Sequence, residues 1–328
     1  MIEVHAAATF QPSNVSIQHP FAIIAAMIGG IAAPLFVTIS GWGTYRSMQR
    51  RSSDQNRLSY RWIMTRVTAL IFFQWIVNII SPNLFEWYSP GILSLLAICT
   101  AFSLYLFRFS VQTRIFVLGI VCFSPYLLDY YFITNLSWSE RIYSNDLTTW
   151  VSRICVTGTY PVFPWITFFI LGSLINDINL KLRKTLGILL FSFSISFLIF
   201  SLVTNTTWAL TSGSALLTFF PASVPFLITS MACVLIIYEL LLLYNRKKES
   251  TGRDSGFIHM GKLSLTIYVL HFIPFSLYNV SGIDYDFSIY SSFIIIIFYT
   301  LIWWFFAILH LRYCKHISLE RLLKIISD

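Results

Sequence analysis

The sequence predicts an all-α protein, a polytopic transmembrane helical bundle, and three observations lead to this prediction: the composition, the apolar runs and the placement of the basic residues. Of the 328 residues, 56% are hydrophobic and only 11% are charged. Soluble domains carry about 25% charged residues, and a soluble fold of this length could not bury so many large apolar side chains. The composition therefore indicates an integral membrane protein.

Nine apolar runs divide the chain. A helix that crosses a bilayer needs about 20 predominantly apolar residues, and the runs cover residues 20–44, 62–80, 90–107, 115–131, 161–175, 185–203, 222–244, 257–278 and 289–311. We therefore expect about nine spans in a single integral membrane domain that covers residues 1–328. The opening "MIEVHAAATF" is typical of the end of a helix, so we also expect one further span before it, which would give ten.

The basic residues predict how these spans are oriented. With nine spans, 20 of the 22 Lys and Arg residues fall on alternate flanks, and only Arg141 and Arg153 fall on the others. Cytoplasmic loops carry the excess of Lys and Arg. We therefore expect a multi-pass protein of the plasma membrane, with the N-terminus of this chain extracytoplasmic and the C-terminus cytoplasmic. Residues 1–19 then form an outer N-terminal segment, 132–160 the longest outer loop and 312–328 a cytoplasmic tail.

Several classes of function are not supported. Topology accounts for the net charge of +8, so a nucleic-acid partner is not predicted. The five cysteines stand singly, without C-x-x-C or His-rich spacing, so neither a metal site nor a disulfide framework is expected. No P-loop, G-x-G-x-x-G or G-x-S-x-G motif indicates a nucleotide or serine-hydrolase site.

The stretch "KLSLTIYVLHFIPF" (262–275) places His271 inside an apolar run. Ionisable residues within spans are rare and usually functional, because lipid cannot solvate them. If the run is one continuous helix from Phe257, His271 lies roughly 21 Å along it, in the outer part of the bilayer. A hydrogen bond to a neighbouring helix is the structural alternative, but we favour a histidine that lines a polar cavity and takes part in catalysis.

Three further residues are expected near the same outer level and are candidate catalytic groups. His5 belongs to the outer N-terminal segment, and His19 directly precedes the span that begins at Pro20. Asp129 ends the fourth span, where a carboxylate could orient an imidazole; an ordinary helix-end residue is the alternative. Gln74 and Asn78 share one face of the second span and either join two helices or line the same cavity.

On the expected inner face, Arg61 and Arg66 stand beside other arginines. One interpretation is a topological signal that also attracts anionic lipid. The other is a clamp for the phosphates of an anionic cytosolic cofactor. The spacing alone leaves both interpretations open.

Several stretches resemble a known family of membrane enzymes. "IAAPLFVTISGWGTYRS" (31–47) followed by "RWIMTRVTALIFF" (61–73) is similar to the start of the heparan-α-glucosaminide N-acetyltransferase-like proteins. "GTYPVFPWITFFILGSLI" (158–175) resembles their Pro-rich outer turn and the span after it, and "GKLSLTIYVLHFIPF" (261–275) resembles their late span. The tail "HISLERLLKII" (316–326) is similar to the ending of related membrane acyltransferases. Acyltransferase-3-like proteins share several of these features.

The resemblance implies an integral membrane acyltransferase. Such an enzyme moves an acetyl or other acyl group from cytosolic acetyl-CoA, or another acyl-CoA, to a sugar or glycan acceptor on the opposite face. It uses a histidine near the outer face, as a general base or as a nucleophile. His19 matches this histidine by its position 15 residues before Pro34, and His5 matches the histidine that ends the first span of related acyltransferases.

The implied partners are membrane lipids, the acyl-CoA donor and the extracytoplasmic acceptor, with no metal. Two alternatives remain open at this point. One is a transporter for a small polar or lipid-linked solute, which interrupted spans would favour. The other is a family member without catalytic activity.

Overall fold

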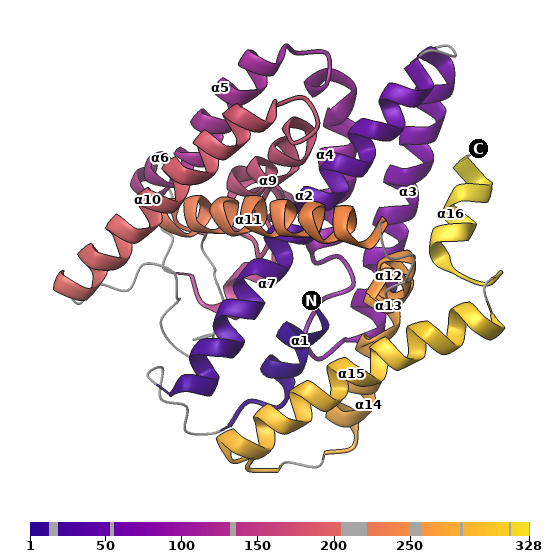
Figure 1. The fold of residues 1–328 in the computed structure, drawn as a ribbon. Helices are drawn as coiled ribbons and strands as arrows, with labels where there is room; N and C mark the ends of the chain where they lie inside the picture. The colour runs from indigo at the N-terminus through magenta and orange to yellow at the C-terminus, as the bar shows by residue number, and fades with distance from the viewer. Residues whose placement is uncertain are drawn as a thin grey trace.

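The computed structural model describes residues 1–12, 19–52, 56–131, 136–204, 222–249, 257–282, 285–314 and 316–327. Over these residues the chain folds into helices and contains no strand, which confirms the predicted all-α class (Figure 1). In chain order the elements are α1 (Ile2–Thr9), α2 (Pro20–Ser52), α3 (Asn56–Ile80), α4 (Ile92–Leu106), α5 (Val111–Cys122), α6 (Ser124–Tyr131), α7 (Trp138–Ile142), α8 (Leu147–Ser152), the π-helical turn η1 (Arg153–Thr157), α9 (Val162–Leu174), α10 (Leu180–Thr204), α11 (Val224–Glu249), α12 (Phe257–Lys262), α13 (Ser264–Leu270), α14 (Phe272–Val280), α15 (Ile289–Tyr313) and α16 (Leu319–Ser327).

Each of the nine predicted apolar runs contains at least one described helix. Six of the described helices are long and apolar enough to cross a membrane: Pro20–Arg51, Tyr60–Ile80, Val111–Leu128, Leu180–Thr204, Val224–Asn245 and Ile289–Tyr313. A seventh span results if Leu147–Thr157 and Val162–Leu174, which are bent by 44° at their junction, are counted together. The runs at Ile92–Leu106 and Ser264–Val280 are apolar but shorter. The chain is therefore a multi-pass integral membrane protein.

The run 257–278 is not the single continuous helix that the sequence predicts. It consists of α12, α13 and α14, with breaks at Leu263 and at His271. Pro274 explains the second break, because a proline lacks the amide hydrogen and its ring clashes with the carbonyl group four residues earlier. The estimate of His271's height along one unbroken helix is therefore wrong, and His271 instead lies at the junction of two short helices.

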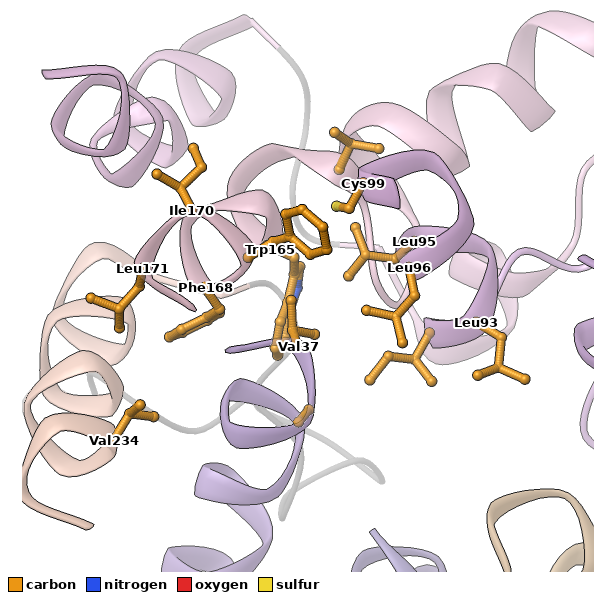
Figure 2. Close-up of a cluster of buried hydrophobic side chains, with 14 of the residues drawn as sticks. Val37, Leu93, Leu95, Leu96, Cys99, Trp165, Phe168, Ile170, Leu171 and Val234 are labelled. Carbon is orange, nitrogen blue, oxygen red and sulfur yellow. The ribbon is translucent and has the colours of Figure 1, made fainter. Parts of the chain in front are cut away.

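Helix α9 is the centre of the hydrophobic core. Its Trp165 and Phe168 point to different sides of the helix and both are buried. Figure 2 shows them packed with Val37 of α2, with Leu96 of α4 and, farther away, with Val234 of α11. A helix that is apolar all round is expected to be enclosed by other helices, and α9 is enclosed in this way.

Two glycines allow α2 and α9 to cross closely. This pair shares more contact than any other two described helices. A Cβ atom added at Gly41 would lie 2.2 Å from the carbonyl oxygen of Phe169, and one added at Gly172 would lie 2.0 Å from that of Thr38. Small residues let two membrane helices bring their backbones together in this manner, so these two positions exclude any side chain.

Replacing Gly172 with alanine is therefore expected to destabilise the protein by about 3 kcal/mol, the upper range for overpacking a tight core. The thermal transition of the purified protein in detergent measures the effect. Gly187→Ala in α10 is the matched control, since nothing lies within 4 Å of a Cβ atom at that position, and it should leave the transition unchanged. A Gly172→Ala variant as stable as the control would contradict this packing.

Hydrogen bonds gather the helix ends into two groups. In one group, the Tyr45 hydroxyl near the end of α2 donates to Asp177 at 2.5 Å. In the other, the Asn78 amide near the end of α3 donates to the carbonyl oxygen of Ser89 at 2.9 Å. We call the first group the basic end and the second the cavity end. Each of these two hydrogen bonds joins the end of one helix to the start or end of a neighbour, as expected when successive spans run in opposite directions.

Candidate active site

A cavity of about 360 Å³ lies at the cavity end, between α1, α2, α3 and the α13–α14 pair. Most of its wall is apolar. The polar side chains in the wall are His5, Thr9, Gln11, Gln74, Thr159, Tyr160, Tyr268 and Asn279. A mostly apolar cavity with a few converging polar groups is the usual form of a small-molecule site.

Small residues place α1, and with it His5, against this cavity. Helix α1 packs between α2 and α15 (Figure 1), where its Ala6 and Ala7 are buried. A Cβ atom at Gly29 of α2 would lie 3.3 Å from the side chain of Val4. The close approach of α1 to α2 leaves the His5 side chain in the cavity wall.

His5 and His271 are in contact. Their ring centroids are 5.1 Å apart, and the ring of Phe272 lies 4.7 Å from that of His5. The His271 side chain is completely buried. The Nε2 atoms of both imidazoles are buried without a hydrogen-bond partner. Because a buried polar atom without a partner costs free energy, these two nitrogens indicate a site prepared for a ligand or a reaction.

The hydrogen bonds of His271 define its tautomer. Its Nδ1 atom lies 3.1 Å from the carbonyl oxygen of Ile267. A carbonyl oxygen only accepts hydrogen bonds, so Nδ1 carries the hydrogen and Nε2 is the basic nitrogen. The Tyr299 hydroxyl donates to the backbone carbonyl of His271 at 2.7 Å and holds the junction of α13 and α14 against α15.

For Gln74 and Asn78 the sequence left two roles open: joining two helices or lining the cavity. The structure shows both roles at this pair. Gln74 lines the cavity, donates to Asn78 at 2.9 Å and accepts from the amide of Leu93 at 3.1 Å. A Cβ atom at Gly91 would lie 2.6 Å from the Gln74 amide nitrogen. Gln74 therefore forms part of the cavity wall, and the pair ties the loop before α4 and the start of α4 to α3.

The segment after residue 135 packs over this loop. The Trp150 indole donates to the carbonyl oxygen of Tyr88 at 3.0 Å, and the Tyr88 hydroxyl donates to that of Ser144 at 3.1 Å. A capping box starts α7, in which Glu140 accepts from Ser137. These hydrogen bonds lower the pKa of the Glu140 carboxyl group. The predicted outer loop is thus partly helical and fixed beside the cavity.

The structure does not bring His19 into this cavity. The ring of His19 contacts Phe21 and Tyr290, with centroids 5.4 Å and 5.9 Å away, and its Nδ1 accepts from the Phe21 amide at 3.3 Å. His19 does not line the cavity. Asp129 lies on α6, but its side chain is outside the described part of the chain.

At the basic end, Arg66 is held beside Trp62 and Arg51. The guanidinium groups of both arginines lie 4.8 Å from the Trp62 ring centroid. The Nε atom of Arg66 is buried without a hydrogen-bond partner. Arg61, the residue before Trp62, is exposed. Two cations on one ring form a surface suited to an anion.

The basic end also contains a buried ion pair that the sequence did not predict. Arg114 of α5 is 2% exposed and pairs with Asp177, which also accepts from Tyr45. A second guanidinium nitrogen of Arg114 donates to the carbonyl oxygen and the hydroxyl of Ser173, at 3.2 and 3.1 Å. The network joins α2, α5 and the end of α9. No local sequence pattern links residues so far apart in the chain.

Tyr160, Tyr268 and Asn279 also line the cavity and were missed as individual site residues. Tyr268 precedes His271 by one helical turn, which is the signal that could have found it. Among the residues that the structure describes, no group of three or more His, Cys, Asp or Glu side chains is arranged to hold a metal ion.

Comparison with known proteins gives one match. Residues 1–189 match the family model described as heparan-alpha-glucosaminide N-acetyltransferase, catalytic, which is more than half of the 328 residues. The matched region includes His5, Gln74 and Arg66, whereas His271 lies beyond it. No curated protein and no solved structure matches the chain.

Proposed function

Since this chain belongs to the heparan-alpha-glucosaminide N-acetyltransferase family, we propose that it transfers an acetyl or other acyl group from cytosolic acyl-CoA to an extracytoplasmic sugar or glycan. The observation that supports this most strongly is the contact between His5 and His271 at the wall of a mostly apolar cavity that has a few polar groups. Two imidazoles with unpartnered nitrogens suit proton transfer to and from an acceptor.

In the proposed reaction, His5 contacts the acceptor, because it lines the cavity and His271 does not. An imidazole nitrogen takes the proton of the acceptor's amine or hydroxyl group as that group attacks the thioester carbonyl. The carbon–sulfur bond then breaks, and the CoA thiolate leaves and takes up a proton. General-base catalysis of this kind contributes about 10²–10⁴ in rate.

In a second form of the mechanism, the reaction passes through an acyl-imidazole intermediate. Here the neutral imidazole attacks the thioester first, CoA leaves, and the acceptor then takes the acyl group from the nitrogen. His271, with its Nδ1–H fixed on Ile267, presents its basic Nε2 beside His5 and can receive a proton from it. Asp129 stays a proposal as a carboxylate that orients an imidazole, and the catalytic role predicted for His19 stays a prediction that a His19→Ala variant tests.

The donor is proposed to enter from the basic end. The phosphates of acyl-CoA would reduce the repulsion between Arg66 and Arg51 on Trp62, and Arg61 would add a third cation nearby. This orientation follows from the excess of Lys and Arg on these flanks. In the proposed orientation the C-terminus is cytoplasmic and the cavity lies toward the opposite face of the plasma membrane.

Transport of a small polar or lipid-linked solute is the alternative, and one observation favours it. The segment Phe257–Val280 is interrupted twice, and interrupted spans form the binding sites of many transporters. Acetyl-CoA binding separates the two functions, since a transporter should not bind it.

Sealed proteoliposomes test the proposed enzyme. Labelled acetyl-CoA is supplied on the side of the C-terminal tail, and a glucosamine-terminated oligosaccharide is enclosed on the other side. We expect label in the oligosaccharide, and none when acetyl-CoA is supplied only on the acceptor's side. Vesicles with the His5→Ala variant are the control. No transfer in the first arrangement, or equal transfer in both, would overturn the proposal.

A further inference from the structure

The C-terminal helix α16 is amphipathic and only partly covered. Leu323 and Ser327 are buried, and the helix packs on α3 and α13. Three aliphatic side chains remain exposed: Leu322, Ile325 and Ile326, at 47%, 67% and 53%. At 100° per residue these three lie on one arc beside the buried edge.

The basic residues of α16 lie beside the exposed aliphatic arc, on the side away from the buried Leu323. Arg321 and Lys324 are exposed, and at 100° per residue they lie about 40° and about 100° from Ile325. An apolar arc beside exposed basic residues is the pattern of a helix that lies at a bilayer surface and attracts anionic lipid. Since α3 is long and apolar enough to cross a membrane, the exposed arc of α16 lies beside a helix that is expected to face lipid.

Glu320 ties α16 to the start of α13. Its carboxylate accepts from the amides of Leu265 and Thr266 at 2.6 and 3.0 Å and from the Thr266 hydroxyl at 2.6 Å. The Leu319 amide donates to the same hydroxyl at 2.9 Å. The first amides of a helix have no partner within it, and a carboxylate there also interacts favourably with the helix dipole. Glu320 therefore supplies the cap that α13 lacks in its own sequence.

The position of this cap relates α16 to the candidate active site. Helix α13 begins at the cap and ends at His271. From Ser264 to Leu270 α13 rises roughly 10 Å, so the capped start and His271 are the two ends of one short helix. Glu320 thus acts on the far end of the helix that carries His271.

We infer that α16 inserts its exposed aliphatic arc into the lipid bilayer at the basic end and, through Glu320, holds the helix that ends at His271. The bilayer is the partner, with anionic head groups at Arg321 and Lys324. Glu320 is a positioning residue, and its importance for catalysis rests on the proposed role of His271. The anchoring and the positioning themselves are measurable without any activity.

Quenching by nitroxide-labelled lipids tests the anchoring. A fluorescent label is attached to a cysteine at position 325 or 324, in the full chain carrying Cys314→Ser, in vesicles of phosphatidylcholine and phosphatidylglycerol. The labelled Cys314→Ser parent corrects for the remaining cysteines. We expect several-fold stronger quenching by an acyl-chain nitroxide for Ile325→Cys than for Lys324→Cys. Equal quenching at the two positions, as for a helix covered by protein or by water, overturns the anchoring.

Modification of His271 by diethyl pyrocarbonate, followed by mass spectrometry, tests the positioning. Removing a carboxylate that accepts three hydrogen bonds should open α13 often enough to raise the rate at least about tenfold in Glu320→Ala. Glu320→Asp should restore most of the protection, and Gly187→Ala in α10, a position with nothing within 4 Å of an added Cβ atom, should leave the rate unchanged. If Glu320→Ala fails to fold, Thr266→Val, which removes one donor, should give a smaller rise. An unchanged rate in the folded variant overturns the positioning role.

Discussion

Replacing His5 or His271 with alanine is expected to lower acyl transfer by about 10²–10⁴-fold, the usual contribution of a general base. The reason is that these two imidazoles contact each other at 5.1 Å, and each has a nitrogen that nothing else in the described structure satisfies. The initial rate of labelled acetyl transfer in proteoliposomes measures the loss. The Michaelis constant for acetyl-CoA should change little, because its phosphates are proposed to bind at the other end.

His19→Ala is the matched control for this prediction. It removes the same side chain from the same end of the protein, but His19 contacts Phe21 and Tyr290 and does not line the cavity. We expect its rate to stay within about threefold of the wild type, the range of context effects for a remote residue. A large loss in His19→Ala with normal rates in the other two variants would transfer the catalytic role to His19.

Replacing Asp177 with alanine is expected to destabilise the protein by about 3 kcal/mol, because it leaves the charge of Arg114 buried and unpaired. The side chains of Arg114 and Asp177 are 3% and 18% exposed, so water can relieve little of this cost. The thermal transition in detergent and the yield of monodisperse protein measure the effect.

The double variant Arg114→Met with Asp177→Leu is the control for this second prediction. Removing both charges costs less than leaving one of them unpaired, so the double variant should be more stable than Asp177→Ala. A double variant that is as unstable as Asp177→Ala, or less stable, would contradict this explanation. The loss of stability would then come from the lost packing and hydrogen bonds and not from an unpaired charge.

The fold class followed from the sequence because lipid imposes a strong constraint. The long apolar runs that contain α2, α10 and α15 must be helices, since only helices and closed barrels satisfy backbone hydrogen bonds in a bilayer. The broken segment from Phe257 was predicted less well. Its apolar composition is that of one span. The break at His271 depends on Pro274, and the cap of α13 at the earlier break comes from Glu320, 55 residues beyond Leu265.

The candidate site was partly predictable for a related reason. An imidazole in an apolar run is conspicuous, so His271 could be selected from composition alone. Its partner was one of several histidines expected at the same level, and only the packing of α1 against Gly29 distinguishes His5 from His19. Arg114 and Asp177 could not be paired, because neither their spacing nor their neighbours indicate a contact across three helices.

The central claim is that His5 and His271 act together on an acyl group, and the double variant His5→Ala with His271→Ala tests it most directly. Residues that act as one unit show strongly non-additive losses. We therefore predict that labelled acetyl transfer by the double variant is no slower than that of the slower single variant, with the thermal transition retained. Losses that multiply, or a double variant as active as the wild type, would contradict the account.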